Sequence, residues 1–292
     1  MESTTNITQT IIDTINSIFE KIFASIDNNL YSVLDEITFI NSDILTDRNF
    51  EKIFGTSTSN GILLIANSLL IGFILYYSVK FLLSHFTYQK VENPFNFFIK
   101  AVFFGLCMNF SFFIVTIFLD FNSYISLAIR AHGETLFGKN ICFSELINLI
   151  NSKISVNTNS LDIFSVDGFI QSTLRLSLLN LIFSYSLRYI MIKIFVLLSP
   201  FAFLSLCLNS TSWFFKAWIK NLFSLLFIQI IVALVLLILF SLDFSSANLL
   251  NQFIYIGGIY ALIKANSFVR EFIGGVSTDI SQSVHNFSNF KL

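Results

Sequence analysis

The sequence has few charges and few of the residue patterns that carry out catalysis. Asp, Glu, Lys and Arg make up only 12% of its 292 residues, against about a quarter in soluble domains. It lacks the spacings that mark zinc proteases, serine hydrolases, phosphate-binding loops and paired-cysteine metal sites. Its three histidines, His85, His132 and His285, are far apart along the chain. We therefore expect neither an enzyme nor a metal or cofactor site.

Cysteine and proline are also scarce. The three cysteines have no metal-like spacing; Cys107 and Cys207 fall in apolar runs and Cys142 in a polar stretch. We expect small packed side chains, not a disulfide framework. The N-terminus is acidic and polar, with no basic region leading into an apolar core, so no cleavable signal peptide is expected.

Apolar residues are abundant: 54% of the chain is hydrophobic, and its mean hydropathy is +0.74. Several apolar runs reach about 20 residues, the length that crosses about 30 Å of hydrocarbon as a helix. These runs do not alternate in polarity, as the strands of a membrane barrel do. The sequence predicts an all-α, polytopic membrane protein.

Charge predicts how the chain crosses the membrane. We expect five spans, at 61–83, 97–119, 169–199, 222–242 and 249–268, none of which contains an acid. The stretch 80–100, which joins the first two spans, carries Lys80, Lys90 and Lys100 against one acid, Glu92. Short cation-rich loops stay in the cytoplasm, whereas residues 1–60 hold nine acids and three bases. The N-terminus is therefore expected outside and the C-terminus inside.

The chain divides accordingly into five regions. They are an external amphipathic helical segment (1–60), spans one and two with a basic cytoplasmic loop (61–120), an external loop (121–168), spans three to five (169–268) and a cytoplasmic tail (269–292). The apolar run 169–208 is too long for one straight crossing. In the alternative, the chain turns near Arg188 and makes six spans, which leaves Lys216, Lys220 and Arg270 outside and is disfavoured by their charge.

The N-terminal segment has an apolar stripe at helical spacing. Its central members are Ile11, Ile15, Ile18, Ile22 and Ile26. Such a stripe either rests on the bilayer or its own protein, or forms a self-association surface around a symmetry axis.

Cations inside apolar runs are costly and mark candidate sites. Arg175, Arg188 and Lys193 fall in the third span and Lys264 in the fifth. They either snorkel to headgroups or line a water-filled lumen suited to lipid phosphates or an anionic passenger. The sequence leaves open whether Arg188 and Lys193 face lumen, headgroup or protein.

The stretch after this span predicts a helix end and an interfacial segment. Pro200 is expected to end the crossing helix, because proline lacks an N–H and clashes with the preceding turn. Trp213 and Trp218, beside Lys216 and Lys220, are expected to be interface anchors.

Two further pairs of residues concern helix contacts. Asn67 and Asn109 sit within predicted spans and should hydrogen-bond between helices. Gly257 and Gly258 permit either close helix contact or a hinge.

The order of features in "LRYIMIKIFVLLSPFAFLSLCLNSTSWFFKAWIKNLFSLLFIQIIVALVLLI" has a parallel in a known family. A basic helix, a proline, a short linker, a tryptophan-plus-lysine segment and a glutamine-bearing span resemble the TrbL-type polytopic subunit of conjugation and type IV secretion machines (the sixth product of VirB-type operons). "GGIYALIKANSFVREFIGGVSTD" looks like the tail of that family's last span. The resemblance covers about residues 169–275.

This resemblance implies a non-enzymatic channel or scaffold subunit of the bacterial inner membrane, active in DNA or protein transfer and pilus biogenesis. The implied partners are further copies (a pentamer), membrane lipids, the bitopic scaffold subunit, the pilin, the pilus-tip subunit and the ATPases, with transient contact to single-stranded DNA or secreted protein. The alternatives are a small-solute transporter and, third, a membrane-embedded enzyme. The runs show no mirrored halves of the kind common in transporters.

Overall fold

A computed structural model describes residues 10–18, 28–55, 61–87, 92–154, 166–242 and 249–273 of the protein. Within these ranges the regular elements are helices and no strand occurs. Four helices are long and apolar enough to cross a membrane: Ile62–Phe86, Ser111–Phe137, Arg175–Cys207 and Ser212–Phe240. Pro94–Asn109 and Phe253–Ala265 are shorter apolar helices. The predicted all-α, multi-pass membrane fold is confirmed at this level, and the number of five crossings stays a prediction.

The N-terminal part begins with a helix over residues 10–18. It continues with α2 (Asn28–Thr38), the 3-10 helix η1 (Ser42–Leu45) and α3 (Arg48–Phe54). We call residues 28–55 the N-terminal strap. The remaining elements are α4 (Ile62–Thr87), α5 (Pro94–Asn109), α6 (Ser111–Phe137), α7 (Phe143–Ile154), α8 (Val166–Leu204), η2 (Ser205–Cys207), α9 (Ser212–Phe240) and α10 (Leu249–Ile273).

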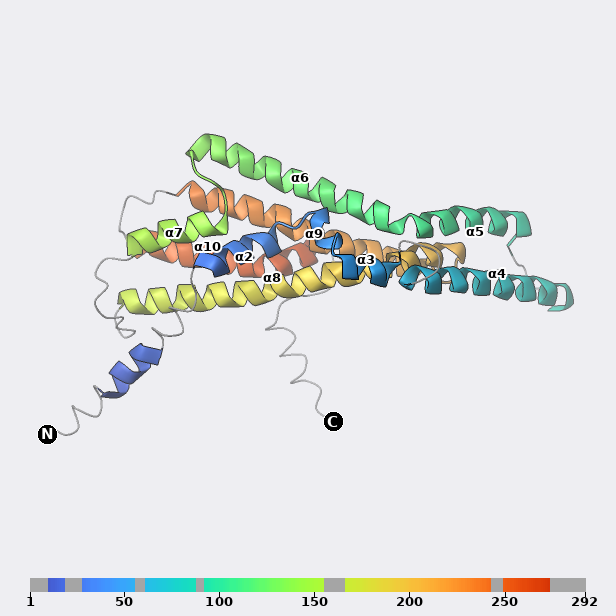
Figure 1. The fold of residues 1–292 in the computed structure, drawn as a ribbon, viewed down its shortest axis with the longest axis horizontal. Coiled ribbons are helices and arrows are strands. Elements are labelled where there is room, and N and C mark those ends of the chain that lie inside the picture. The colour runs from blue at the N-terminus through green and yellow to red at the C-terminus, as the bar shows by residue number, and fades with distance from the viewer. Residues whose placement is uncertain are drawn as a thin grey trace.

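The helices form an elongated bundle (Figure 1). At 1.5 Å per residue α8 is about 58 Å long and follows most of its length. The hairpin of α4 and α5 occupies one end, and α7 with the beginning of α8 occupies the other. Helix α9 packs against α6, α8 and α10, and its buried residues run from Trp218 to Phe240. It therefore forms the core on which the other helices assemble.

Helix α6 corrects two sequence predictions. The predicted second span, 97–119, divides at Phe110, whose N–H still donates to the carbonyl oxygen of Leu106 at 3.0 Å. Helix α6 then continues through Asp120 and ends at Gly138, which adopts a left-handed φ of 63° that suits glycine. The region 121–168, predicted as an external loop, is therefore helical over 121–137 and in α7, and its place outside the membrane stays a prediction. Asp120, which follows the predicted second span, accepts the backbone N–H of Ser42 at 3.2 Å.

Pro200 does not end its helix. It lies inside α8, which continues to Leu204. Proline at this position leaves the carbonyl of Val196 without its usual helical donor. The hydroxyl of Ser199 donates to that carbonyl oxygen instead, at 2.7 Å. The helix end comes at η2, and the chain turns at residues 208–211 into α9.

The start of α5 contacts the α8–α9 turn. The ammonium of Lys100 pairs with the carboxylate of Glu92 and donates to Oδ1 of Asn209 at 3.2 Å. The residues before α5 and the turn before α9 therefore lie at one end of the bundle. The prediction that both segments lie on the cytoplasmic side of the membrane stays a prediction.

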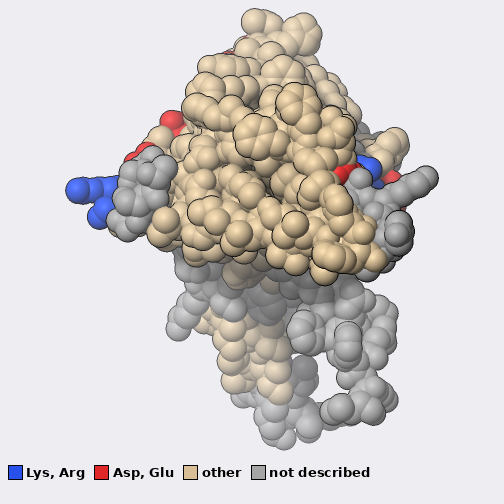
Figure 2. Space-filling view, turned by 90° about the vertical axis from the view of Figure 1, so that its right-hand side faces the viewer, with Lys and Arg blue, Asp and Glu red and all other residues tan. Residues whose placement is uncertain are grey.

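Much of the apolar surface is uncovered. In the most apolar 18-residue stretch of each helix, 17% of the residues of α4 and 22% of those of α6 are buried. The corresponding share is 56% for α8 and for α9. Figure 2 looks at the end formed by α4 and α5 and shows a largely uncharged face, with Lys, Arg, Asp and Glu confined to its two sides. Large exposed apolar areas mark contact with lipid or with other proteins.

Candidate functional site

A fully buried arginine joins the N-terminal strap to the bundle. Arg188, on α8, has an exposed fraction of 0%. Its Nε donates to the carbonyl oxygen of Leu225 on α9 at 2.8 Å, and its Nη1 donates to that of Thr38 at 2.9 Å. Its Nη2 lies 3.4 Å from Oε1 of Gln229. One guanidinium therefore holds the strap, α8 and α9 together.

Gln229 extends this contact to a third helix. Its Oε1 accepts the backbone N–H of Ile40 at 3.1 Å, and its Nε2 donates to the hydroxyl of Ser126 on α6 at 2.8 Å. Gln229 is itself fully buried. Both ends of its amide are used, so it cannot be replaced by an apolar residue without leaving buried polar groups unpaired.

Two carboxylates hold the strap on either side of Thr38. The carboxylate of Asp35 accepts the backbone N–H groups of Phe143 and Ser144 at 2.7 and 3.1 Å, and also the Ser144 hydroxyl at 2.8 Å. These groups form the start of α7, where a negative charge is favourable. Asp120 on α6 accepts the backbone N–H of Ser42 at 3.2 Å.

Arg130 on α6 completes this set of contacts. Its guanidinium carbon lies 4.1 Å from the ring centroid of Phe39, and its Nε donates to the carbonyl oxygen of Ile141 at 2.6 Å. Residues 35–42 of the strap are thus held by polar groups of α6, α7, α8 and α9. We call this set of contacts the strap joint.

The strap joint has a clear physical reason. Residues 39–41 connect α2 to η1 without regular structure, and their backbone groups need partners in an apolar bundle. Polar side chains from later parts of the chain supply them. Arg188 contacts the carbonyl of Thr38, the last residue of α2, and the end of a helix carries a partial negative charge.

The predicted intramembrane cations are placed differently from one another. Arg188 faces protein on all sides, so the prediction of a lumen or lipid-phosphate contact is wrong for it. Lys193 is partly exposed, with its Nζ 5.5 Å from the ring of Phe50 and 5.1 Å from that of Tyr189. Arg175 is also partly exposed. The lumen or lipid-phosphate reading of Lys193 and Arg175 stays a prediction.

The two tryptophans differ as well. Trp213 is 66% exposed, and Lys216 and Lys220 are exposed on the same helix. Trp218 is 2% exposed, and its indole N–H donates to the carbonyl oxygen of Phe195 at 2.8 Å. The interface-anchor prediction is wrong for Trp218, which packs between α8 and α9.

The predicted oligomer stripe lies only partly in the described chain. Ile11, Ile15 and Ile18 belong to the helix over residues 10–18, where Ile11 and Ile18 are 54% and 52% exposed. Ile22 and Ile26 lie outside the described residues. The choice between a membrane-resting and a self-associating stripe stays open.

The predicted contact between Asn67 and Asn109 is confirmed. Each side-chain amide donates to the other's carbonyl oxygen, at 3.2 and 3.3 Å. This pair ties α4 to α5 near the junction with α6.

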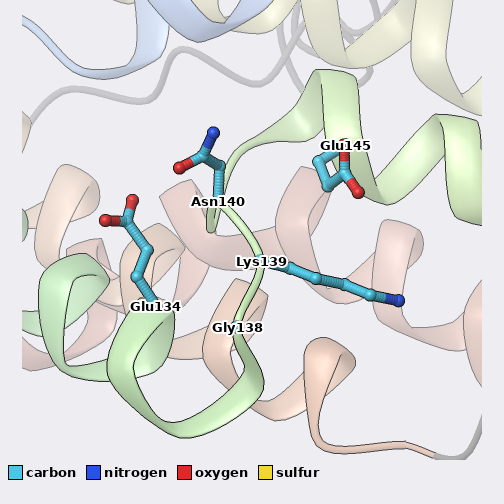
Figure 3. Close-up of a pocket in the computed structure, with 5 residues that line it drawn as sticks. All are labelled: Glu134, Gly138, Lys139, Asn140 and Glu145. Atoms are coloured by element: carbon cyan, nitrogen blue, oxygen red, sulfur yellow. The ribbon is translucent and has the colours of Figure 1, made fainter.

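A shallow surface pocket at the α6–α7 turn offers no comparable site. Glu134, Gly138, Lys139, Asn140 and Glu145 line it, and its volume is about 470 Å³. In Figure 3 the two carboxylates lie apart, and the side chain of Lys139 extends away from Glu134. No group of His, Cys, Asp and Glu in the described part of the chain could hold a metal ion.

Sequence reasoning singled out Arg188 but missed its partners. A single glutamine in the most apolar run was the available signal for Gln229, and no local pattern connects it to Ile40, 189 positions away. Comparisons of the chain with protein-family models, with curated proteins and with solved structures find no match.

Proposed function

We propose that this protein is a non-enzymatic channel or scaffold subunit of a type IV secretion machine in a bacterial inner membrane. There it would help to pass DNA or protein across the membrane and to organise pilus assembly. The sequence pattern of residues 187–238, with its basic helix, Pro200, paired tryptophans and glutamine-bearing span, supports the family.

The observation that carries the proposal is the uncovered apolar surface. The exposed apolar side chains of α4, α5 and α6 include Ile71, Leu75, Phe98, Phe103 and Phe113. This surface needs lipid or apolar protein partners, as a subunit embedded in a membrane assembly would have. The polar interior, by contrast, is used to hold the strap.

That use of the interior favours a scaffold over a solute transporter. A transporter places polar groups around a substrate near the middle of the membrane. Here Arg188, Gln229 and Asp120 bond to backbone groups of the same chain.

The test is to delete the gene in its native host and to measure transfer of single-stranded DNA or of a secreted protein. We expect transfer to fall by orders of magnitude and to return when the intact chain is supplied. Membrane levels of the complementing chain are measured beside transfer. Normal transfer in the deletion strain, or solute flux through the purified chain in liposomes, would contradict the proposal.

A further inference from the structure

Two exposed lysines lie one helical turn apart near the start of α9. Lys216 and Lys220 are four positions apart, so their side chains leave the same face of the helix. Among the described residues neither lysine makes a hydrogen bond or an ion pair. Like charges at this spacing repel each other, and an anion placed between them would relieve that repulsion.

The described surroundings of these lysines do not balance their charge. Helix α9 contains no acidic residue and has no side-chain cap at its start, so the positive end of the helix dipole adds to the two lysines. Lys100, which reaches the preceding turn through Asn209, is by contrast paired with Glu92. Lys216 and Lys220 are therefore available to an anion from outside the chain.

The same face of α9 is apolar beyond the lysines. Its exposed side chains there recur at helical spacing and are Phe223, Phe227, Leu234 and Ile238. The ring centroid of Phe223 lies 5.2 Å from that of Phe118 on α6, so α6 borders this surface. From Lys220 to Ile238 the helix rises about 27 Å, close to the thickness of about 30 Å of the hydrocarbon layer.

Trp213 supports this position of the membrane boundary. It is 66% exposed and lies three positions before Lys216, on the side away from the apolar face. Tryptophan favours the level of the lipid headgroups, and a lysine stem can lie on apolar surface while its ammonium reaches a phosphate. The two lysines are thus placed at headgroup level, directly above a surface suited to acyl chains.

We propose that Lys216, Lys220, Phe223 and Phe227 form a selective binding site for one anionic phospholipid. The lipid phosphate lies between the two ammonium groups, and an acyl chain lies along the two phenylalanines beside α6. A free phosphate would meet the lysines but leave the apolar face uncovered, whereas a phospholipid matches both parts. A zwitterionic lipid has no net charge and is attracted less strongly.

This site goes beyond the proposed secretion function and does not depend on it. Each lysine near an anionic headgroup strengthens the attraction, so two should favour phosphatidylglycerol over phosphatidylcholine by on the order of tenfold. The preference should shrink as salt rises, because the lysines are exposed and their charges are screened.

The experiment measures lipid selectivity by fluorescence quenching in vesicles. Phe223→Trp in a Trp213→Phe chain places a reporter beside the acyl chains, while Trp218 is buried and shielded. The full chain is reconstituted in phosphatidylcholine vesicles that contain the same fraction of either brominated phosphatidylglycerol or brominated phosphatidylcholine. We expect stronger quenching by brominated phosphatidylglycerol, and glycerol phosphate in the buffer should leave that excess unchanged.

Paired variants in the reporter chain locate the headgroup. Lys216→Gln/Lys220→Gln should remove the excess quenching, and Lys216→Arg/Lys220→Arg should keep most of it. Lys52→Gln/Lys139→Gln is the matched control, because it removes the same charge from two lysines that are exposed on other parts of the chain. This control should keep the full excess.

Native mass spectrometry of the unaltered chain in detergent gives an independent measurement. It should retain one phosphatidylglycerol more readily than one phosphatidylcholine, and it decides the question even if the reporter chain fails to fold. Equal retention of the two lipids, equal quenching by them, or an excess that survives in the Lys216→Gln/Lys220→Gln chain would overturn the site. Loss of the excess on adding glycerol phosphate would overturn it too, because the lysines would then bind a free phosphate.

Discussion

Nη1 of Arg188 donates to the carbonyl oxygen of Thr38 at 2.9 Å, across 150 positions of sequence. This bond joins the strap, which lies near the N-terminus in sequence, to α8, which lies in the second half of the chain. The strap can therefore reach its place only after α8 and α9 exist. Arg188, which looks like a channel or headgroup cation in the sequence, is a structural residue.

Arg188→Met should destabilise the fold, and Lys193→Gln should not. Removing the guanidinium takes one donor away from each of three buried oxygens, a loss of about 2–4 kcal/mol in the free energy of unfolding. Arg188→Lys should rescue little, because an ammonium cannot match the fork of a guanidinium. The measurement is chemical unfolding in detergent beside membrane protein levels. Equal stability of the Arg188→Met and Lys193→Gln variants would contradict the buried placement.

The two tryptophans of α9 give a second matched pair. Trp218→Phe removes the bond to Phe195 and packed volume between α8 and α9, and should lower the free energy of unfolding by about 1–3 kcal/mol. Trp213→Phe, at an exposed site, should change it by less than about 0.5 kcal/mol. Single-tryptophan variants should also differ in fluorescence quenching by acrylamide or brominated lipid, with Trp218 shielded. Equal quenching of both would argue against this packing.

Neighbouring glycines on α10 test the contact of that helix with α9. A Cβ on Gly258 would collide with the side chain of Leu239, whereas one on Gly257 would meet nothing within 4 Å. Gly258→Ala should therefore lower stability by about 1–3 kcal/mol. Gly257→Ala should be neutral or slightly stabilising, because alanine favours a helix. The melting temperatures of the two variants in detergent are compared. A lower melting temperature for Gly257→Ala than for Gly258→Ala would show that α10 packs through another face.

Cys142 tests the α6–α7 turn by its pH dependence. Burial raises the pKa of its thiol, and Sγ also accepts the backbone N–H of Glu145 at 3.4 Å. A raised pKa leaves less thiolate at neutral pH, so maleimide labelling of a Cys107→Ala/Cys207→Ala chain should be slow near pH 7. The rate should climb as pH rises through the raised value. Fast labelling at pH 7 would mean that this turn is open.

The sequence predicted the apolar helices well and their limits less well. Apolar length located α4, α8 and α9, because a run of about 20 apolar residues has few other stable forms. The predicted helix ends were wrong near Pro200 and Asp120, because the helices continue through both residues. In each case a hydrogen-bond partner makes the residue tolerable inside the helix. The Ser199 hydroxyl replaces a lost donor next to Pro200, and the Ser42 N–H satisfies Asp120 from 78 positions away.

The candidate site could be predicted from the sequence only in part. Arg188 could be recognised as unusual, because an arginine in an apolar run needs a reason. Whether it meets water, lipid or protein depends on which segment lies beside it. That segment, residues 35–42, is an ordinary amphipathic stretch in sequence, so only the fold reveals the strap joint.

The most direct test of the strap joint is a disulfide between Asp35→Cys and Ser144→Cys in a chain whose native cysteines are replaced by alanine. The Asp35 carboxylate and the Ser144 hydroxyl lie 2.8 Å apart, so mild oxidation in native membranes should cross-link these positions within one chain. A protease site placed between residues 56 and 60 would reveal the link, since the two fragments stay joined until reduction. Asp35→Cys with Asn67→Cys is the matched control, because Asn67 bonds Asn109 on α5 instead. Fragments that separate without reductant, or a link that forms only between two chains, would contradict the strap joint.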